Sequence, residues 1–394
     1  MEASTVQSLR GRPFAEVADQ VAQHLLADQV DAAELSTLVR AALDFPVPLV
    51  ELERDIYALE LFHGPTFAFK DVGARFMAAL LGHVGNDERE ELTILVATSG
   101  DTGSAVAHAF LDVPWVRTVV LYPRGKVSEL QERQFTTLGG NVRAIEVEGT
   151  FDDCQRIVKE AFVDDELRAV LQLTSANSIN IGRLLPQVFY YFHAWAQLPN
   201  AHAPVFSVPS GNFGNLTGGL IAKRLGLPVR GFVAATNAND TVPEYLRTGE
   251  VRPRSSVPTI SNAMDVGGPS NLARILALYR EDLDLLRADV IGSVHDDTGT
   301  RQAISQTYES TGRVLDPHSA VGYLGIADGL EAFGDGPAIF LATAHPVKFR
   351  EVVEVETGST VPIPDRLAAR LGAERQVLSI GATLAELRDT LLDD

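Results

Sequence analysis

The amino-acid sequence predicts an α/β protein with two lobes, each built on a mostly parallel sheet flanked by helices. The chain has 394 residues, more than a single domain usually holds. Short apolar runs rich in branched side chains alternate with helical stretches, a pattern typical of parallel sheets. These runs form two series on either side of Leu198-Pro199, so we expect the chain to pass from one lobe to the other near residue 195.

The front of the chain is predicted to be helical. Val17, Val21 and Leu25 recur four residues apart, as on one face of an amphipathic helix. A second apolar face follows before residue 43. We therefore assign residues 1–50 to an N-terminal helical segment.

Each later series alternates strands with helices. The first predicts strands over residues 92–99, 115–123, 141–149 and 170–175, with helices such as 104–111 and 152–162 between them. The second predicts strands over residues 205–211, 229–236 and 338–344, with a helix over 216–226. We assign residues 91–194 to a smaller lobe, and residues 51–90 with 195–394 to a larger lobe.

Composition narrows the classes of partner. The 33 basic and 52 acidic residues give a formal net charge of 33 − 52 = −19. A charge of this sign argues against binding nucleic acid or an anionic membrane. The single cysteine, Cys154, excludes an intrachain disulfide and a cysteine-rich metal site. No long apolar span or signal-peptide core is present. We expect a soluble, cytoplasmic protein without a metal.

Residues 59–76, LELFHGPTFAFKDVGARF, place one lysine among apolar and small residues. Phe67, Ala68 and Phe69 directly precede Lys70. A lysine desolvated in such a setting favours the neutral amine, which can attack an aldehyde to form a Schiff base. The segment is also compatible with an ordinary helix start that leaves Lys70 on a solvated face.

Residues 97–104, ATSGDTGS, lie where a predicted strand gives way to a helix. The carboxyl ends of parallel strands face the ligand crevice, and a helix start there can accept an anion such as a carboxylate. Ordinary helix capping explains the same residues.

Residues 210–215, SGNFGN, form a more specific motif between a strand and a helix. Gly211 and Gly214 permit close backbone approach, and Asn212 and Asn215 tolerate left-handed conformations. The stretch has neither a Walker lysine nor a GxGxxG pattern. It predicts a phosphate bound mainly by uncharged groups, with a tight turn as the alternative.

Residues 174–183, TSANSINIGR, also follow a strand directly. Asn177 and Ser178 offer hydrogen-bond donors, and Arg183 offers one positive charge, for a second phosphate. A polar loop with a surface arginine is the alternative.

Taken together, nine ordered blocks resemble the threonine synthase family of pyridoxal 5'-phosphate enzymes of fold type II. The resemblance runs from about Phe45 to the end of the chain, although a Gly-Leu-aromatic-x-Pro element usual at the front of that family is not found. The blocks are ELFHGPTFAFKD, ATSGDTG, LYPRGKVS, TSANSINIGR, SVPSGNFGN, AATNANDTVP, SNAMDVGGPSN, DPHSAVG and TAHPVKF.

The resemblance implies roles for individual residues. Lys70 matches the family's Schiff-base lysine, Asp101 a position near the phenolic oxygen of pyridoxal 5'-phosphate, and Thr343 the hydroxyl facing its pyridine nitrogen. The loop around the cofactor phosphate matches Gly211, Asn212, Phe213, Gly214 and Asn215. The positions that hold the substrate's carboxylate end match Thr98, Ser99 and Thr102, and those that hold its phosphate match Asn177, Ser178 and Arg183.

The activity that the resemblance implies is γ-elimination and β-replacement, which turn O-phospho-L-homoserine and water into L-threonine and phosphate. Two alternatives stay open. One is a phospho-lyase that releases 2-oxobutyrate from the same substrate, and the other is a non-catalytic protein that binds pyridoxal 5'-phosphate. The sequence leaves open whether the chain is a monomer or a homodimer.

Overall fold

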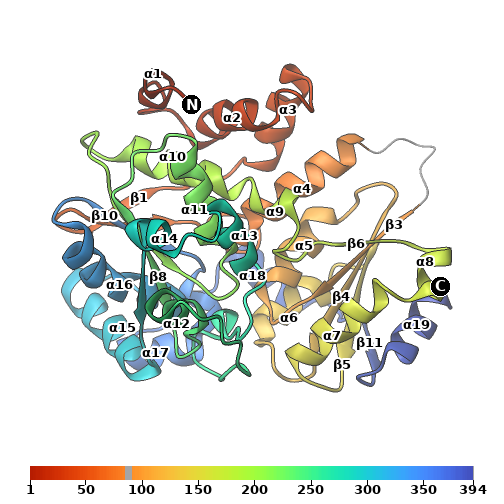
Figure 1. Cartoon of the computed structure of the whole chain (residues 1–394). Helices are drawn as coiled ribbons and strands as arrows, with labels where there is room; N and C mark the ends of the chain where they lie inside the picture. The colour runs from red at the N-terminus through yellow and green to blue at the C-terminus, as the bar shows by residue number, and fades with distance from the viewer. Residues whose placement is uncertain (85–90, 394) are drawn as a thin grey trace. The chain divides into compact units, whose positions relative to one another are not determined.

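The structure is a computed structural model that describes residues 1–84 and 91–393. The chain forms two compact units, coloured along the sequence in Figure 1. The larger unit contains residues 1–69 and 184–362, and the smaller unit contains residues 70–183 and 363–394. Both units are α/β, as the sequence predicts.

The larger unit is built on a six-stranded sheet. Its strand order is β1-β2-β10-β7-β8-β9, and all neighbours pair in parallel except β1 with β2. The strands are β1 (Leu49–Glu53), β2 (Ile56–Glu60), β7 (Val205–Pro209), β8 (Gly231–Thr236), β9 (Val290–Val294) and β10 (Ala338–Ala342).

Helices cover this sheet. The long helix α16 (Pro317–Phe333) contacts β7, β8 and β10, and α10 (Gln187–Gln197) packs against both α2 (Phe14–Leu26) and α11 (Gly214–Arg224). The remaining helices are α1 (Ala3–Gln7), α3 (Ala32–Ala42), α12 (Thr241–Thr248), η1 (Asn262–Met264), α13 (Leu272–Leu278), α14 (Leu283–Asp289), α15 (Asp297–Thr311), η2 (Pro346–Phe349) and α17 (Arg350–Thr357), and α9 (Ile181–Leu184) spans the boundary between the units.

The smaller unit is built on a five-stranded parallel sheet. Its strand order is β11-β5-β4-β3-β6. The strands are β3 (Leu92–Ala97), β4 (Val116–Pro123), β5 (Val142–Val147), β6 (Gln172–Ser175) and β11 (Val377–Ile380). The helices are α4 (Lys70–Val84), α5 (Asp101–Phe110), α6 (Glu129–Thr136), α7 (Phe151–Ala161), α8 (Asp165–Val170), α18 (Asp365–Leu371) and α19 (Leu384–Leu392).

Both faces of the smaller sheet are buried. Ile94 and Val96 of β3 belong to one apolar cluster, whereas Leu95 and Ala97 belong to another. Successive side chains of a strand point to opposite faces, so each face has its own core. This explains why β3 reads as a continuous apolar run instead of an alternating one.

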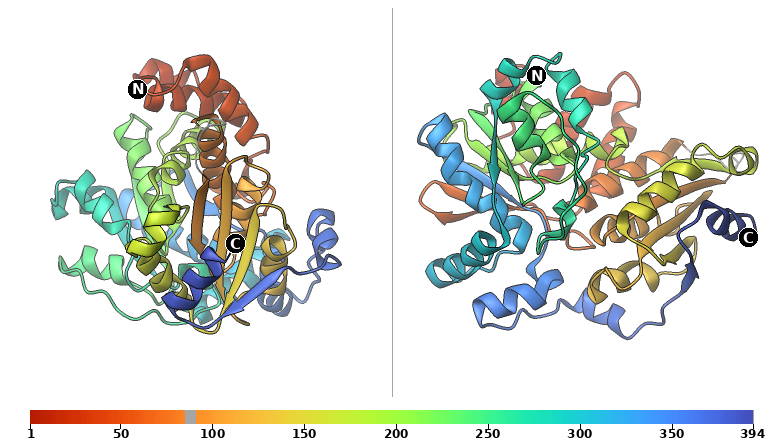
Figure 2. Two further views of the ribbon diagram at one scale, coloured as in Figure 1. Left: turned by 90° about the vertical axis from the view of Figure 1, so that its right-hand side faces the viewer. Right: turned by 60° about the horizontal axis from the view of Figure 1, so that its bottom comes forward.

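The structure divides the chain differently from the sequence in four places. Residues 1–50 and 184–194 belong to the larger unit, although the sequence suggested a separate helical segment for the first and the smaller lobe for the second. Lys70–Val84 and residues 363–394 belong to the smaller unit, although the sequence suggested the larger lobe for both. The C-terminal part joins it because β11 pairs with β5, and Figure 2 shows the dark-blue C-terminal segment beside the strands of this sheet. β11 lies at the sheet edge, and its four residues, although mostly apolar, were not predicted as a strand.

Candidate active site

Lys70 is the first residue of α4 in the smaller unit. Its side chain is 15% exposed, and its Nζ lies 3.6 Å from Oδ2 of Asp101, whose side chain is 3% exposed. The apolar surround expected from the sequence is therefore only part of the setting, because a buried carboxylate faces the amine. Lys70 is not on a solvated face.

A chain of hydrogen bonds orients Asp101. Gln131 donates from Nε2 to Asp101 Oδ1 at 2.8 Å, and its Oε1 accepts from Ser128 Oγ at 2.9 Å. Gly100 has φ +141°, and a Cβ there would lie 2.6 Å from Gln131 Cδ. Glycine is therefore required both for the backbone conformation and for the approach of Gln131. Sequence reasoning missed Gln131, since it lies 30 residues from its partner.

Thr98 shapes the turn that leads into α5. Its Oγ1 accepts from the N–H groups of Gly100 at 2.9 Å and Gly103 at 2.8 Å. The residue is fully buried. Of the three residues predicted to hold the substrate's carboxylate end, Thr98 is thus engaged by the protein itself, while Ser99 and Thr102 are half-buried.

The residues predicted for the substrate phosphate lie in the same unit, at the carboxyl end of β6. Asn177 Nδ2 donates to the backbone oxygen of Ala97 at 3.0 Å, which joins this loop to the end of β3. Ser178 is half-buried beside it. Thr98, Ser99 and Thr102 therefore share one edge of the five-stranded sheet with this loop.

Arg183 is 4% exposed. Burial lowers the pKa of its guanidinium to about 10, and the Asp71 carboxylate opposes that shift, so Arg183 still carries its charge at neutral pH. Its Nη1 donates to the backbone oxygen of Ala176, and a Cβ at Gly73 would lie 2.6 Å from the Arg183 backbone oxygen. The alternative of a surface arginine is wrong.

In the larger unit, the residues directly before Lys70 are tied to the segment after β10. The Phe69 N–H donates to the Thr343 backbone oxygen at 2.9 Å, and the His345 N–H donates to the Phe67 backbone oxygen at 3.1 Å. Phe67 is left-handed, with φ +59°. Lys70 directly follows Phe69, the residue whose N–H binds Thr343. Lys70 and Thr343 themselves are 273 positions apart in the sequence (343 − 70).

The SGNFGN loop joins β7 to α11 in the larger unit. Its left-handed residue is Phe213, with φ +59° and ψ +12°, whereas Asn212 and Asn215 do not have positive φ. Gly211 matters for space, because a Cβ there would lie 2.6 Å from Met264 Cα. The side chain of Phe213, the residue before α11, makes no capping hydrogen bond.

The segment with Ser270 and Asn271 supports the SGNFGN loop through hydrogen bonds to Asn212. Asn212 Oδ1 accepts from the Ser270 N–H at 2.7 Å and from Ser270 Oγ at 2.9 Å, and Asn271 Nδ2 donates to the Asn212 backbone oxygen at 3.0 Å. Asp265, in the same segment, accepts hydrogen bonds from Asn237 Nδ2, Asn239 Nδ2, Thr259 N–H and Thr259 Oγ1. Ser270 and Asn271 thus hold the SGNFGN loop at Asn212, while Asp265 ties its own segment to Asn237, Asn239 and Thr259.

Comparison with known proteins identifies this arrangement. A family model described as pyridoxal-phosphate dependent enzyme matches residues 42–344, and one described as threonine synthase, C-terminal matches residues 319–391. Threonine synthase from Escherichia coli (strain K12) is 49% identical over 370 residues, covering 93% of this chain and 85% of the relative. The chain belongs to the threonine synthase family.

Solved structures agree with this membership of the threonine synthase family. The crystal structure of threonine synthase from Escherichia coli superposes with a TM-score of 0.93 at 45% identity, covering 100% of this chain and 91% of that one. The pyridoxal-phosphate-bound threonine synthase from Brucella melitensis superposes with a TM-score of 0.92 at 34% identity, covering 99% of this chain and 90% of that one. The fold is that of the type II pyridoxal-phosphate enzymes, and the protein is a pyridoxal-phosphate-dependent lyase.

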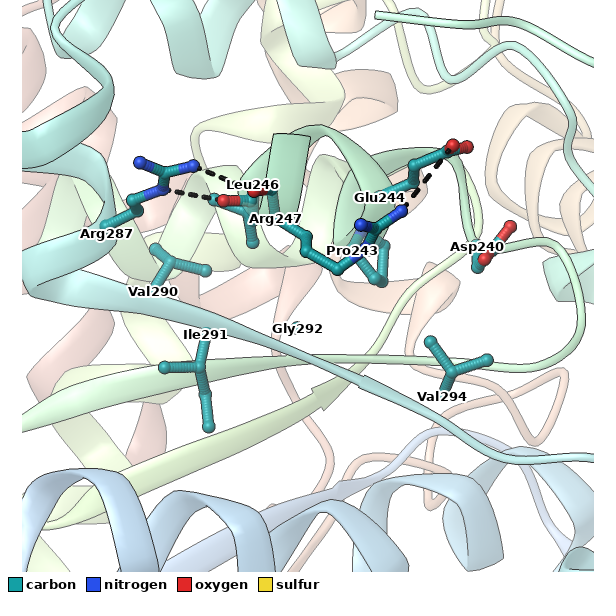
Figure 3. A pocket seen from close by; sticks show the side chains of 10 residues that line it. All are labelled: Asp240, Pro243, Glu244, Leu246, Arg247, Arg287, Val290, Ile291, Gly292 and Val294. Atoms are coloured by element: carbon teal, nitrogen blue, oxygen red, sulfur yellow. Dashed lines mark hydrogen bonds and ion pairs between the residues drawn. The ribbon is translucent and has the colours of Figure 1, made fainter. Parts of the chain in front are cut away.

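An open pocket of about 400 Å³ lies elsewhere in the larger unit, between α12, α14 and β9. Figure 3 shows that Arg287 donates to the backbone oxygens of Leu246 and Arg247 there. The Arg247 Nη2 atom lies 3.9 Å from the Glu244 Oε1 atom. None of the predicted site residues lines it. Its lining residues are Asp240, Pro243, Glu244, Leu246, Arg247, Arg287, Val290, Ile291, Gly292 and Val294.

Among the helices that the structure describes, none combines the length and apolar character needed to cross a bilayer. The described residues also contain no group of three or more His, Cys, Asp or Glu side chains arranged to hold a metal ion.

Proposed function

We propose that this chain converts O-phospho-L-homoserine and water into L-threonine and phosphate, with Lys70 as the residue that binds pyridoxal 5'-phosphate. The observation that carries the proposal is the setting of Lys70, whose largely buried amine lies 3.6 Å from the buried carboxylate of Asp101. Structural ion pairs are common, but a buried one at a helix start in this family's lysine block favours a catalytic role.

The residues of the larger unit fit the phosphate of pyridoxal 5'-phosphate. The side chain of Phe213, the residue before α11, makes no capping hydrogen bond, and the helix dipole favours an anion at this helix start. Asn215 is 5% exposed, and its Nδ2 has no hydrogen-bond partner among the described residues. A buried donor without a partner is costly, so its presence supports a ligand at this position.

When bound, pyridoxal 5'-phosphate supplies an electron sink that makes the carbon-bound protons of an amino acid acidic. Lys70 would bind its aldehyde and, once the substrate amine replaces it, move protons at Cα and Cβ of the substrate. Asp101 stands against the Lys70 amine and is held in place by Gln131. Thr343, with its uncharged hydroxyl, would face the pyridine nitrogen.

Arg183 would hold the phosphate that leaves from Cγ, together with Asn177 and Ser178. The charge is already desolvated, since Arg183 is 4% exposed. A charge fixed in a water-poor site stabilises a developing dianion more strongly than a solvated one does. Ser99 and Thr102 are the half-buried hydroxyl groups proposed for the carboxylate end of the substrate.

The decisive experiment is incubation of the purified protein with O-phospho-L-homoserine and pyridoxal 5'-phosphate, followed by identification of the organic product. We expect L-threonine and phosphate in equal amounts. Release of 2-oxobutyrate as the main product would instead establish the phospho-lyase alternative, which the comparisons do not support. We further propose a cytoplasmic location, in keeping with the single buried thiol of Cys154.

A further inference from the structure

Two adjacent tyrosines lie behind the start of α11. Tyr190 and Tyr191 belong to α10, are fully buried, and lie in the larger unit with the SGNFGN loop. The Tyr190 hydroxyl lies 2.6 Å from Asn215 Oδ1, and the Tyr191 hydroxyl lies 2.8 Å from the same oxygen and 3.0 Å from the Asn215 backbone oxygen. Two hydroxyl groups thus converge on one amide.

This convergence depends on close packing of α10 and α11. A Cβ at Gly219 would lie 2.8 Å from Tyr191 Cζ, and one at Gly218 would lie 3.0 Å from Gln187 Cβ. The two glycines therefore allow the helices to approach closely enough for the tyrosine hydroxyls to reach the first turn of α11. Tyr191 also stacks edge-on with Phe206, at 5.1 Å between ring centroids, which fixes its ring.

Both tyrosine hydroxyl groups can act as hydrogen-bond donors. Burial raises the pKa of both tyrosines well above its usual value, so both stay protonated and can donate. An amide oxygen accepts such bonds, whereas an amide nitrogen cannot. In the structure, the Asn215 oxygen faces both hydroxyls, and its Nδ2, on the other branch of the amide, is a buried donor without a partner among the described residues.

We propose that Tyr190 and Tyr191 are positioning residues that fix the Asn215 amide with its N–H groups directed at the cofactor phosphate. This inference rests on the proposed function, since it takes pyridoxal 5'-phosphate as the ligand. Without the hydroxyls the amide is free to rotate, and it loses the orientation in which only donors face the ligand. The effect acts on the phosphate and not on the aldehyde that Lys70 binds.

The test compares two ligands that differ only in that phosphate. Apoenzyme is titrated with pyridoxal 5'-phosphate and with pyridoxal, and binding is followed by absorbance. For the variant in which both Tyr190→Phe and Tyr191→Phe are made, we expect the dissociation constant for pyridoxal 5'-phosphate to rise about 10- to 100-fold, the range of one charge-assisted hydrogen bond. The constant for pyridoxal should change less than about threefold.

Two further variants keep the result interpretable. Asn215→Ala should weaken binding as much as the double tyrosine variant, and combining all three changes should add little, because they remove one interaction. Tyr279→Phe is the matched control, since it removes another buried hydroxyl, one bonded to Asp289 at 2.6 Å, and should leave both constants unchanged.

Equal losses for both ligands would overturn the inference and indicate a general structural role. Unchanged affinity for pyridoxal 5'-phosphate in the double variant, or in each single variant if the double one does not fold, would overturn it as well. Wild-type protein that binds no pyridoxal 5'-phosphate would contradict the proposed function itself, so the two failures are distinguishable.

Discussion

The helix starts of α5 and α11 follow parallel strands in the same way but use their N–H groups differently. At α5, the Thr98 hydroxyl accepts from Gly100 and Gly103, so the turn is satisfied by its own side chain. At α11, the side chain of the preceding Phe213 makes no capping hydrogen bond, and the buried amide nitrogen of Asn215 has no partner among the described residues.

The difference separates a structural turn from a ligand site. Both segments are glycine-containing loops after a strand, and both predict an anion site from sequence. Because an unpaired buried donor costs free energy, the Asn215 amide nitrogen, which has no partner among the described residues, supports a ligand at the α11 start. At the α5 start, Thr98 takes up the N–H groups of Gly100 and Gly103, and the turn also places Asp101 beside Lys70.

The largest expected effect is that of Lys70→Ala, which should abolish catalysis while leaving the binding of the cofactor phosphate intact. Lys70→Ala should lower threonine formation by more than about 1,000-fold, because it removes the proposed covalent and proton-transfer group. Pyridoxal 5'-phosphate should still bind through the α11 loop, as measured by equilibrium dialysis. Near-normal threonine formation in this variant would remove the central assignment.

A paired experiment tests whether the two units hold different phosphates. Arg183→Ala should lower kcat/KM for O-phospho-L-homoserine by about 10- to 100-fold, as expected from losing a charge-assisted hydrogen bond, with bound cofactor near normal. Gly214→Val should do the reverse and empty the cofactor site, because a branched side chain blocks backbone approach to the phosphate.

Arg183→Lys is the control for charge, since it keeps a cation but loses the planar fork. It should recover part of the kcat/KM lost in Arg183→Ala and keep a charge beside Asp71. If Arg183→Ala loses cofactor and shows unaltered kinetics after reconstitution, the two phosphate sites have been assigned in reverse.

Thr98→Val tests whether the α5 turn is structural. Removing the hydroxyl leaves two N–H groups without an acceptor, which should lower the free energy of unfolding by about 1–3 kcal/mol. Thr98→Ser keeps the hydroxyl and serves as the control. Urea unfolding measures the effect. A raised KM with unchanged stability would instead support direct contact between Thr98 and the substrate.

The smallest effect concerns pH and the support of the α11 loop. Burial raises the pKa of Asp265 to about 6, against the opposing hydrogen bonds from Thr259 and Asn237. Since this lies above the value of about 3.9 in an unfolded chain, protonated Asp265 contributes stability that is fully present below about pH 4 and lost as pH rises through about 6.

Asp265→Asn removes this titration. Between pH 4 and pH 7, the free energy of unfolding of wild type relative to the variant should fall by about 1 kcal/mol, a value reduced for partial solvent screening. Urea unfolding at several pH values measures the difference. A difference that stays constant, or that rises with pH, would show that the hydrogen bonds outweigh burial at this carboxyl.

Local sequence determined much of this protein. The alternation of apolar runs predicted seven strands, β3 to β8 and β10, because burial on both faces leaves a continuous apolar signal. The ordered blocks predicted the family and its cofactor. Lys70 and the SGNFGN loop could be selected because lysine among apolar residues, and glycine after a strand, are unusual enough to read locally.

Tertiary structure decided the partners of these residues. Gln131 reaches Asp101 across 30 positions and Thr343 holds Phe69 across 274 (343 − 69), and no local pattern encodes such pairs. Tyr190 and Tyr191 read as ordinary core residues of an apolar helix until Gly218 and Gly219 bring α11 against them. Periodicity reports which face of an element is buried, whereas the direction of a hydrogen bond depends on which element packs against that face.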